Sequence, residues 1–228
     1  MASIWLVVER IHTEVGVNET SRRDFLSTLG TLAGSAVIPG AIEAQSAPQG
    51  GGWDMSWLDR LTGKQKQVFD FSNPMMLQVP RNWLDAHELV YGLRHSEVNA
   101  VVGISSASFP VNATDAMYAK YPIGVEWKIM DPATGKPAMR NIFLDGSGTP
   151  DERENSVRAL QRRGVIFWQC NNALKRVAGQ IATAVNRSQP EVYADLRASG
   201  LNPGVILVPA HTMLIGLCQG RGCAYEKV

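Results

Sequence analysis

The sequence predicts an α/β fold, a three-layer Rossmann-like sandwich around a mainly parallel sheet of about five strands. Short apolar runs alternate along the chain with segments of helical periodicity, and glycines or prolines separate them. Continuous apolar runs are typical of parallel strands that are buried on both faces. Without the first 47 of its 228 residues, the chain is still long enough for one domain with a large core.

Five segments are predicted to be strands, because each is short, apolar and rich in β-branched or aromatic residues. They are residues 66–71 (KQVFDF), 99–104 (NAVVGI), 165–169 (VIFWQ), 205–208 (VILV) and 224–227 (AYEK). Helical segments lie between consecutive strands, which is the connection that parallel pairing requires.

Six segments are predicted to be helices, namely residues 80–93, 112–121, 156–163, 172–185, 190–199 and 212–219. Asn112 is the expected N-cap residue of the second helix, and Pro122 is expected to stop it. Gly164 and Gly200 follow the third and fifth helices, where a glycine commonly ends a helix.

The first predicted helix carries an apolar stripe. Trp83, Leu84, His87, Val90 and Tyr91 fall at helical spacing, which predicts that this face packs on the sheet.

Two further segments have irregular composition. Residues 131–151 are rich in proline and glycine and are predicted to form a mobile loop. Residues 48–63 are predicted to be a linker and an N-terminal arm whose tryptophans need a packing partner, ahead of the domain at 64–228.

The first 47 residues have the layout of an export signal. The paired Arg22 and Arg23 precede a weakly apolar run and then small residues, which favours a twin-arginine signal and a periplasmic location. The alternative is an amphipathic N-terminal helix of a non-exported protein. The apolar run is too short and too rich in glycine and serine for a stable membrane span.

Charge and motifs limit the function classes. Beyond residue 47 the chain has 19 basic and 16 acidic residues with no basic run, so nucleic-acid binding is not suggested. No HExxH, GxGxxG, P-loop or CxxC motif is present, so no metal site or cofactor is predicted, and a conventional hydrolase or dehydrogenase has no support.

The three cysteines are too few for a disulfide framework. Cys218 and Cys223 lie five residues apart and could pair in an oxidising compartment. Cys170 would then be the odd thiol, placed where a predicted strand ends and a helix begins. Ligand sites of parallel sheets gather at such carboxyl ends. The alternative is that Cys170 is a small apolar residue of the core.

Several segments together resemble the DsrE/DsrF-like proteins, a sulfur-relay family. They are residues 66–71, residues 112–121, the stretch GVIFWQCNNALKR at 164–176, and the C-terminal residues around Pro209, Gly222 and Tyr225. The resemblance covers most of residues 64–228. It implies a Rossmann-like sheet, a homo-oligomer (trimer or hexamer), and a cysteine at the position of Cys170 that carries sulfur as a persulfide.

Such a cysteine has to react as a thiolate, which the amide groups and dipole of a helix N-terminus stabilise. Asn171 and Asn172 are expected to cap this helix or hydrogen-bond the sulfur. Arg176 adds positive charge that suits an anionic sulfur donor such as thiosulfate. His211 follows another strand at the same sheet edge and is a candidate base or ligand for the thiol, or else a structural histidine.

Two functions therefore stay open. One is an exported sulfur carrier, with Cys170 as the catalytic residue and a sulfur donor or redox protein as its partner. The other is a non-enzymatic periplasmic module that binds a small ligand or metal, in which Cys170 is structural.

Overall fold

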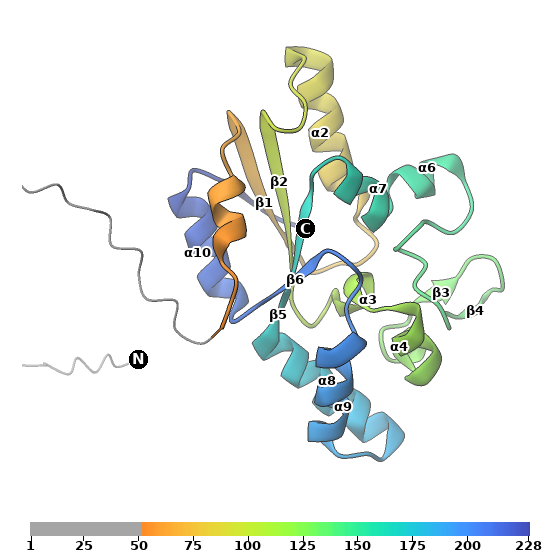
Figure 1. Ribbon diagram of the computed structural model, residues 1–228. Coiled ribbons are helices and arrows are strands. Elements are labelled where there is room, and N and C mark those ends of the chain that lie inside the picture. The colour runs from red at the N-terminus through yellow and green to blue at the C-terminus, as the bar shows by residue number, and fades with distance from the viewer. Residues whose placement is uncertain (1–51) are drawn as a thin grey trace, which may run out of the picture. The chain divides into compact units, whose positions relative to one another are not determined.

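A computed structural model describes residues 52–228 of the chain (Figure 1). Its centre is a five-stranded, all-parallel sheet in the order β6-β5-β2-β1-β7. The strands are β1 (Gln65–Phe71), β2 (Val98–Ile104), β5 (Ile166–Cys170), β6 (Val205–Val208) and β7 (Ala224–Lys227). Helices cover both faces, so the predicted three-layer α/β sandwich is confirmed. The predicted export segment, residues 1–47, lies outside the described residues.

Alternate side chains of the strands pack into two separate cores. Phe69, Val102 and Phe167 are paired neighbours on β1, β2 and β5, and they point to the larger core. Val68 and Trp168 point to the smaller core on the opposite face. All seven residues of β2 are buried, because this strand is central and helices cover it on both sides.

The larger core lies under the helices that connect the strands in order. These include α2 (Gln78–Tyr91), α7 (Val157–Arg162) and α8 (Asn171–Val185), while α9 (Gln189–Ser199) packs against α8. Leu174, Val177 and Ile181 repeat at helical spacing along α8 and are fully buried.

The smaller core lies under α10 (His211–Gly220) and the 3₁₀ helix η1 (Ser56–Arg60), which lie side by side in Figure 1. Trp57 and Leu58 of η1 are buried there, so one of the two tryptophans of the N-terminal arm finds its packing partner at Trp168. The ring centroids of these two tryptophans are 5.9 Å apart.

The position of α10 on its own face follows from the handedness of the connections. From β1 through β2 and β5 to β6 the chain steps one way across the sheet, and the last step to β7 goes the other way. Right-handed crossovers place connections of opposite direction on opposite faces. The chain therefore leaves β5 toward one face and the neighbouring β6 toward the other, which creates a switch point between their carboxyl ends.

The predicted helix at 112–121 is wrong in its start. The chain forms α3 (Phe109–Asn112), turns at Ala113, and continues as α4 (Asp115–Lys120) and α5 (Ile123–Glu126). Asn112 is not a cap, because its buried amide donates to the Trp168 carbonyl at 3.1 Å. Thr114, in extended conformation, precedes α4 instead.

The segment predicted as a mobile loop is partly core. It contains a small hairpin, β3 (Met130–Asp131) and β4 (Lys136–Pro137), and ends in α6 (Pro150–Glu154). Between them Ile142, Phe143 and Leu144 are buried. The amide of Asn141 fixes this stretch by donating to the carbonyls of Val111 and Ala113.

The apolar stripe predicted for residues 80–93 is shorter than expected. Leu84 is buried, but Val90 and Tyr91 are 66% and 69% exposed, because the last turn of α2 extends past the sheet. No helix among residues 52–228 has the length and apolar character needed to cross a membrane.

We expect Phe143→Ala to lower the free energy of unfolding by about 3 kcal/mol, because it removes a buried ring and leaves a cavity. Met139→Ala is the matched control, since this side chain is 70% exposed, and its effect should stay within about 0.5 kcal/mol. Urea denaturation of both variants measures the difference. Equal effects would contradict the assignment of residues 142–144 to the core.

Candidate functional site

Cys170 ends β5 and is itself the N-cap residue of α8. Its backbone is extended, and its Sγ accepts a hydrogen bond of 3.3 Å from the amide of Ala173. The expectation that Asn171 or Asn172 caps this helix is therefore wrong. Both lie inside the first turn, where the preceding residue already occupies the cap position.

A second helix also begins at the same sulfur. The amide of His211, the first residue of α10, donates to Cys170 Sγ at 3.3 Å. The sulfur therefore lies at the switch point of the sheet, between the N-termini of α8 and α10. Both helices direct unpaired amide groups and the positive end of their dipoles toward it.

Cys170 is 3% exposed and is not in a disulfide. Its sulfur is nevertheless not enclosed by hydrocarbon alone, because two backbone N–H groups contact it. This pair of donors suits a sulfur that carries negative charge.

Both ring nitrogens of His211 have a hydrogen-bond partner. Trp168 Nε1 donates to Nδ1 at 3.2 Å, and Nε2 lies 2.7 Å from Asp70 Oδ1. An indole N–H can only donate, so Nδ1 is the acceptor, and Nε2 carries the hydrogen that Asp70 receives. Both ring nitrogens are thus engaged, and neither is free to take a proton from Cys170 in this arrangement.

Asp70 extends the network to the edge strand β7. The hydroxyl of Tyr225 donates to Asp70 Oδ2 at 2.9 Å, and this bond to a carboxylate raises the pKa of the phenol. This hydrogen-bonded network therefore connects four elements on the α10 face of the sheet. They are β5 through Trp168, α10 through His211, β1 through Asp70 and β7 through Tyr225.

Gly103 on β2 makes room for this network. A Cβ built there would lie 2.4 Å from Trp168 Cζ2 and 3.0 Å from His211 Cε1. Only a residue without a side chain lets both rings approach the sheet at this point.

The other predicted site residues surround the start of α8. Asn171 is buried and its Oδ1 accepts from the Tyr193 hydroxyl at 2.6 Å, so it ties α8 to α9. Asn172 is exposed. Arg176 reaches the loop after β2, where its Nη2 donates to Ser106 Oγ at 3.4 Å.

Three residues of the network, Asp70, Trp168 and Tyr225, were not identified from the sequence. Asp70 had a usable signal, because it is a carboxylate within the apolar run Phe69-Asp70-Phe71 at a strand end. Its partner is 141 positions away in the sequence, and local spacing does not reveal such a pair.

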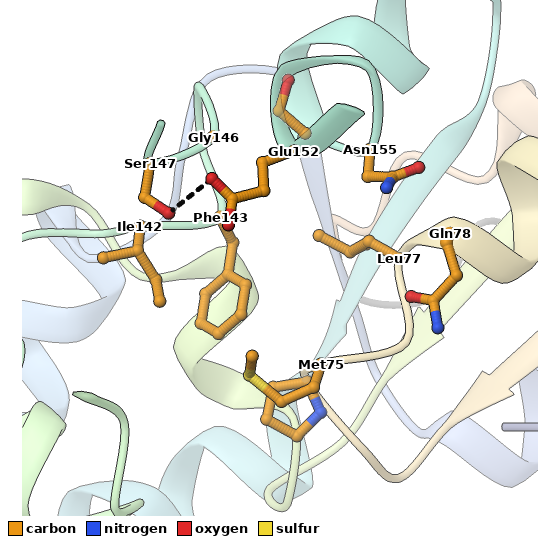
Figure 2. Close-up of a pocket in the computed structure, with 11 residues that line it drawn as sticks. Met75, Leu77, Gln78, Ile142, Phe143, Gly146, Ser147, Glu152 and Asn155 are labelled. Atoms are coloured by element: carbon orange, nitrogen blue, oxygen red, sulfur yellow. Dashed lines mark hydrogen bonds between the residues drawn. The ribbon is translucent and has the colours of Figure 1, made fainter. Parts of the chain in front are cut away.

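The structure also contains a small pocket that shares no residue with this site (Figure 2). Met75 and Leu77, from the loop after β1, face Ile142 and Phe143, and the bonded pair Ser147 and Glu152 lies at its side. Its volume is about 130 Å³. Ligand pockets are usually several hundred Å³, so it is too small for a typical substrate.

A larger pocket of about 820 Å³ lies at the opposite end of the strands from Cys170. Asn99, Ile166 and Ile206, near the amino ends of three strands, line it together with His95. Ligands of parallel sheets usually bind at the carboxyl ends of the strands, which is the end where Cys170 lies. Within residues 52–228 there is no group of three or more His, Cys, Asp or Glu side chains that could hold a metal ion.

No protein-family model and no curated protein matches this sequence. One similar solved structure is the protein of unknown function MTH1491 from Methanobacterium thermoautotrophicum, with 18% sequence identity. The alignment covers 72% of this chain and 99% of that chain, with a TM-score of 0.36. A similarity at this level does not indicate a function.

We expect Gly103→Ala to destabilise the protein by about 2 kcal/mol, because the new methyl group overlaps the Trp168 ring. Gly216→Ala is the control, since a Cβ there meets nothing within 4 Å and alanine favours the helix. In thermal unfolding, the melting temperature should fall for Gly103→Ala and rise for Gly216→Ala. A neutral Gly103→Ala would show that the rings can shift away at no cost.

We also expect neutral His211 to populate the Nε2–H tautomer. Long-range ¹H–¹⁵N correlation spectra distinguish a protonated ring nitrogen from an unprotonated one. Trp168→Phe removes the donor to Nδ1 and should weaken this preference. An Nδ1–H tautomer in the unsubstituted protein would contradict the network.

Proposed function

We propose that this protein carries sulfur as a persulfide on Cys170. The observation that supports the proposal is the contact of one sulfur with the amide groups of two helix N-termini, at 3.3 Å from Ala173 and 3.3 Å from His211. A sulfur anion is stabilised by each of these dipoles and by both hydrogen bonds. The resemblance to the DsrE/DsrF-like proteins motivates the choice of sulfur as the cargo.

The transfer step is a displacement at sulfur. The Cys170 thiolate attacks the outer sulfur of thiosulfate, and the sulfur–sulfur bond of the donor breaks. Sulfite leaves with the electron pair, and Cys170 retains one added sulfur that carries the negative charge. An acceptor thiolate then removes this outer sulfur and restores the Cys170 thiolate.

Arg176 is the group we assign to the anionic donor. It is exposed on the first turns of α8, and its guanidinium contacts Ser106 Oγ in the loop after β2. A guanidinium binds sulfonate-type oxygens well because its donors form a fork. Asn172, exposed in the first turn of the same helix, adds an amide to this surface.

His211 has a positioning role in this proposal. Its backbone amide contacts the sulfur, while its ring is anchored between Trp168 and Asp70. The ring therefore fixes the start of α10 and does not itself transfer the proton. We further propose that the carrier is exported to the periplasm by the Arg22–Arg23 signal, works as a homo-oligomer, and receives sulfur from a donor protein or a small sulfur anion.

Intact-protein mass spectrometry tests the proposal. After incubation of the reduced protein with thiosulfate or polysulfide, we expect one added sulfur atom, located on Cys170 by peptide mapping. Cys170→Ser should lose this addition, whereas the double variant Cys218→Ser, Cys223→Ser should retain it.

Cys170→Ser is also a sound folding control, because serine is a good N-cap residue and preserves the hydrogen bond to Ala173. We expect its stability to equal that of the unsubstituted protein, while Cys170→Ala should lose about 1 kcal/mol with the cap. A correctly folded protein that takes up no sulfur on Cys170 would refute the carrier role. It would favour the rival view, a binding module with a structural cysteine.

A further inference from the structure

The end of α10 brings the two remaining cysteines together. The amide of Cys223 donates to the carbonyl of Cys218 at 3.0 Å, and that of Gly222 donates to Gln219 at 2.9 Å. Gly222 has a φ of +82°. This pair of bonds with a left-handed glycine is a Schellman motif, in which the side chains at the positions of Cys218 and Cys223 meet.

The two cysteines share one apolar cluster. Both belong to the smaller core with Trp57 and Leu58, and neither is in a disulfide. A Schellman turn brings the side chains at its first and last positions toward each other, which is the arrangement that a disulfide requires.

The surroundings of the two thiols favour the thiolate form of Cys223 over that of Cys218. Cys218 lies within the last turn of α10, where the negative end of the helix dipole disfavours a thiolate. Cys223 lies beyond the helix and just before β7, whose first residue Ala224 pairs with Gln67 of β1, so Lys66 lies next to this end of the strand pair. A Cβ on neighbouring Gly222 would lie 3.6 Å from Lys66 Nζ.

Nearby positive charge and the neighbouring thiol both favour Cys223 over Cys218 as the thiolate. Interaction with the Cys218 thiol lowers the pKa of Cys223, and Lys66 and Arg221 contribute. Interaction with Cys223 and burial raise the pKa of Cys218. Cys223 is 6% exposed and Cys218 is 0% exposed, so a reagent reaches Cys223 first.

We propose that Cys218 and Cys223 form a dithiol site that reacts with small disulfides, with Cys223 as the attacking thiol and Cys218 as the resolving thiol. The site is independent of the sulfur carrier. Cys218 follows His211 by seven residues of the same helix, which places it about 10 Å further along the axis.

The reaction balances without another reagent. The Cys223 thiolate attacks one sulfur of a small disulfide, whose sulfur–sulfur bond breaks, and the first thiolate leaves. Cys218 gives its proton to that leaving thiolate and attacks the Cys223 sulfur of the mixed disulfide, which releases the second thiolate. The two cysteines are oxidised to one disulfide, and the reagent is reduced to two thiols, because the second thiolate takes up from solvent the proton that Cys223 released on ionising.

The test uses the full chain with Cys170→Ser, so that the sulfur-carrier site cannot contribute. The reduced protein is treated with 2-hydroxyethyl disulfide, quenched with acid at intervals and mapped by mass spectrometry. We expect loss of two hydrogens and a Cys218–Cys223 linked peptide. Adding Cys218→Ala should instead trap the reagent as a mixed disulfide on Cys223, and adding Cys223→Ala should leave Cys218 unmodified.

Lys66→Gln measures the contribution of charge. We expect the attack by Cys223 to slow by up to about tenfold below pH 8, while Lys64→Gln, at an exposed position two residues earlier, should leave the rate unchanged. Circular dichroism confirms the fold of each variant. The proposal is overturned if the folded protein forms no internal disulfide, or if the reagent is trapped on Cys218 in place of Cys223.

Discussion

The contact of one sulfur atom with two helix N-termini depends on a single topological constraint, the reversal of direction between β6 and β7. Up to β6 the chain moves one way across the sheet, and β7 lies at the opposite edge, beside β1. Right-handed crossovers then send the chain to opposite faces after β5 and β6. Since β5 and β6 are neighbours, α8 and α10 begin side by side. Cys170 is the last residue of β5, and its sulfur contacts the start of both helices.

The sequence predicts this arrangement well where the signal is local. Five short apolar runs and the helical segments between them define the parallel sheet, and the strand end before residues 171–185 marks the Cys170 edge. The residue types at the edge are also readable, because a thiol before a helix is a recognisable chemical pattern. The predicted strand positions all correspond to strands of the sheet.

Where prediction fails, a tertiary contact has replaced a local preference. Asn112 is a good N-cap residue, but its amide is used to bond β5, so the helix restarts after Thr114. Residues 142–144 follow a proline- and glycine-rich stretch, yet they are apolar and find a place in the larger core. The Asp70–His211 pair joins residues from opposite ends of the domain, and neither has a local partner.

The two thiol sites proposed here differ because α10 has two unlike ends. Its N-terminus directs the His211 amide group and the positive end of the helix dipole toward the Cys170 sulfur. Its C-terminus has the opposite potential, and a thiolate there requires compensating side chains. Lys66 and Arg221 both lower the pKa of Cys223, whereas of these two only Arg221 acts on Cys218. The two proposed sites therefore lie at opposite ends of one helix, the sulfur-carrier site at its start and the asymmetric thiol pair at its end.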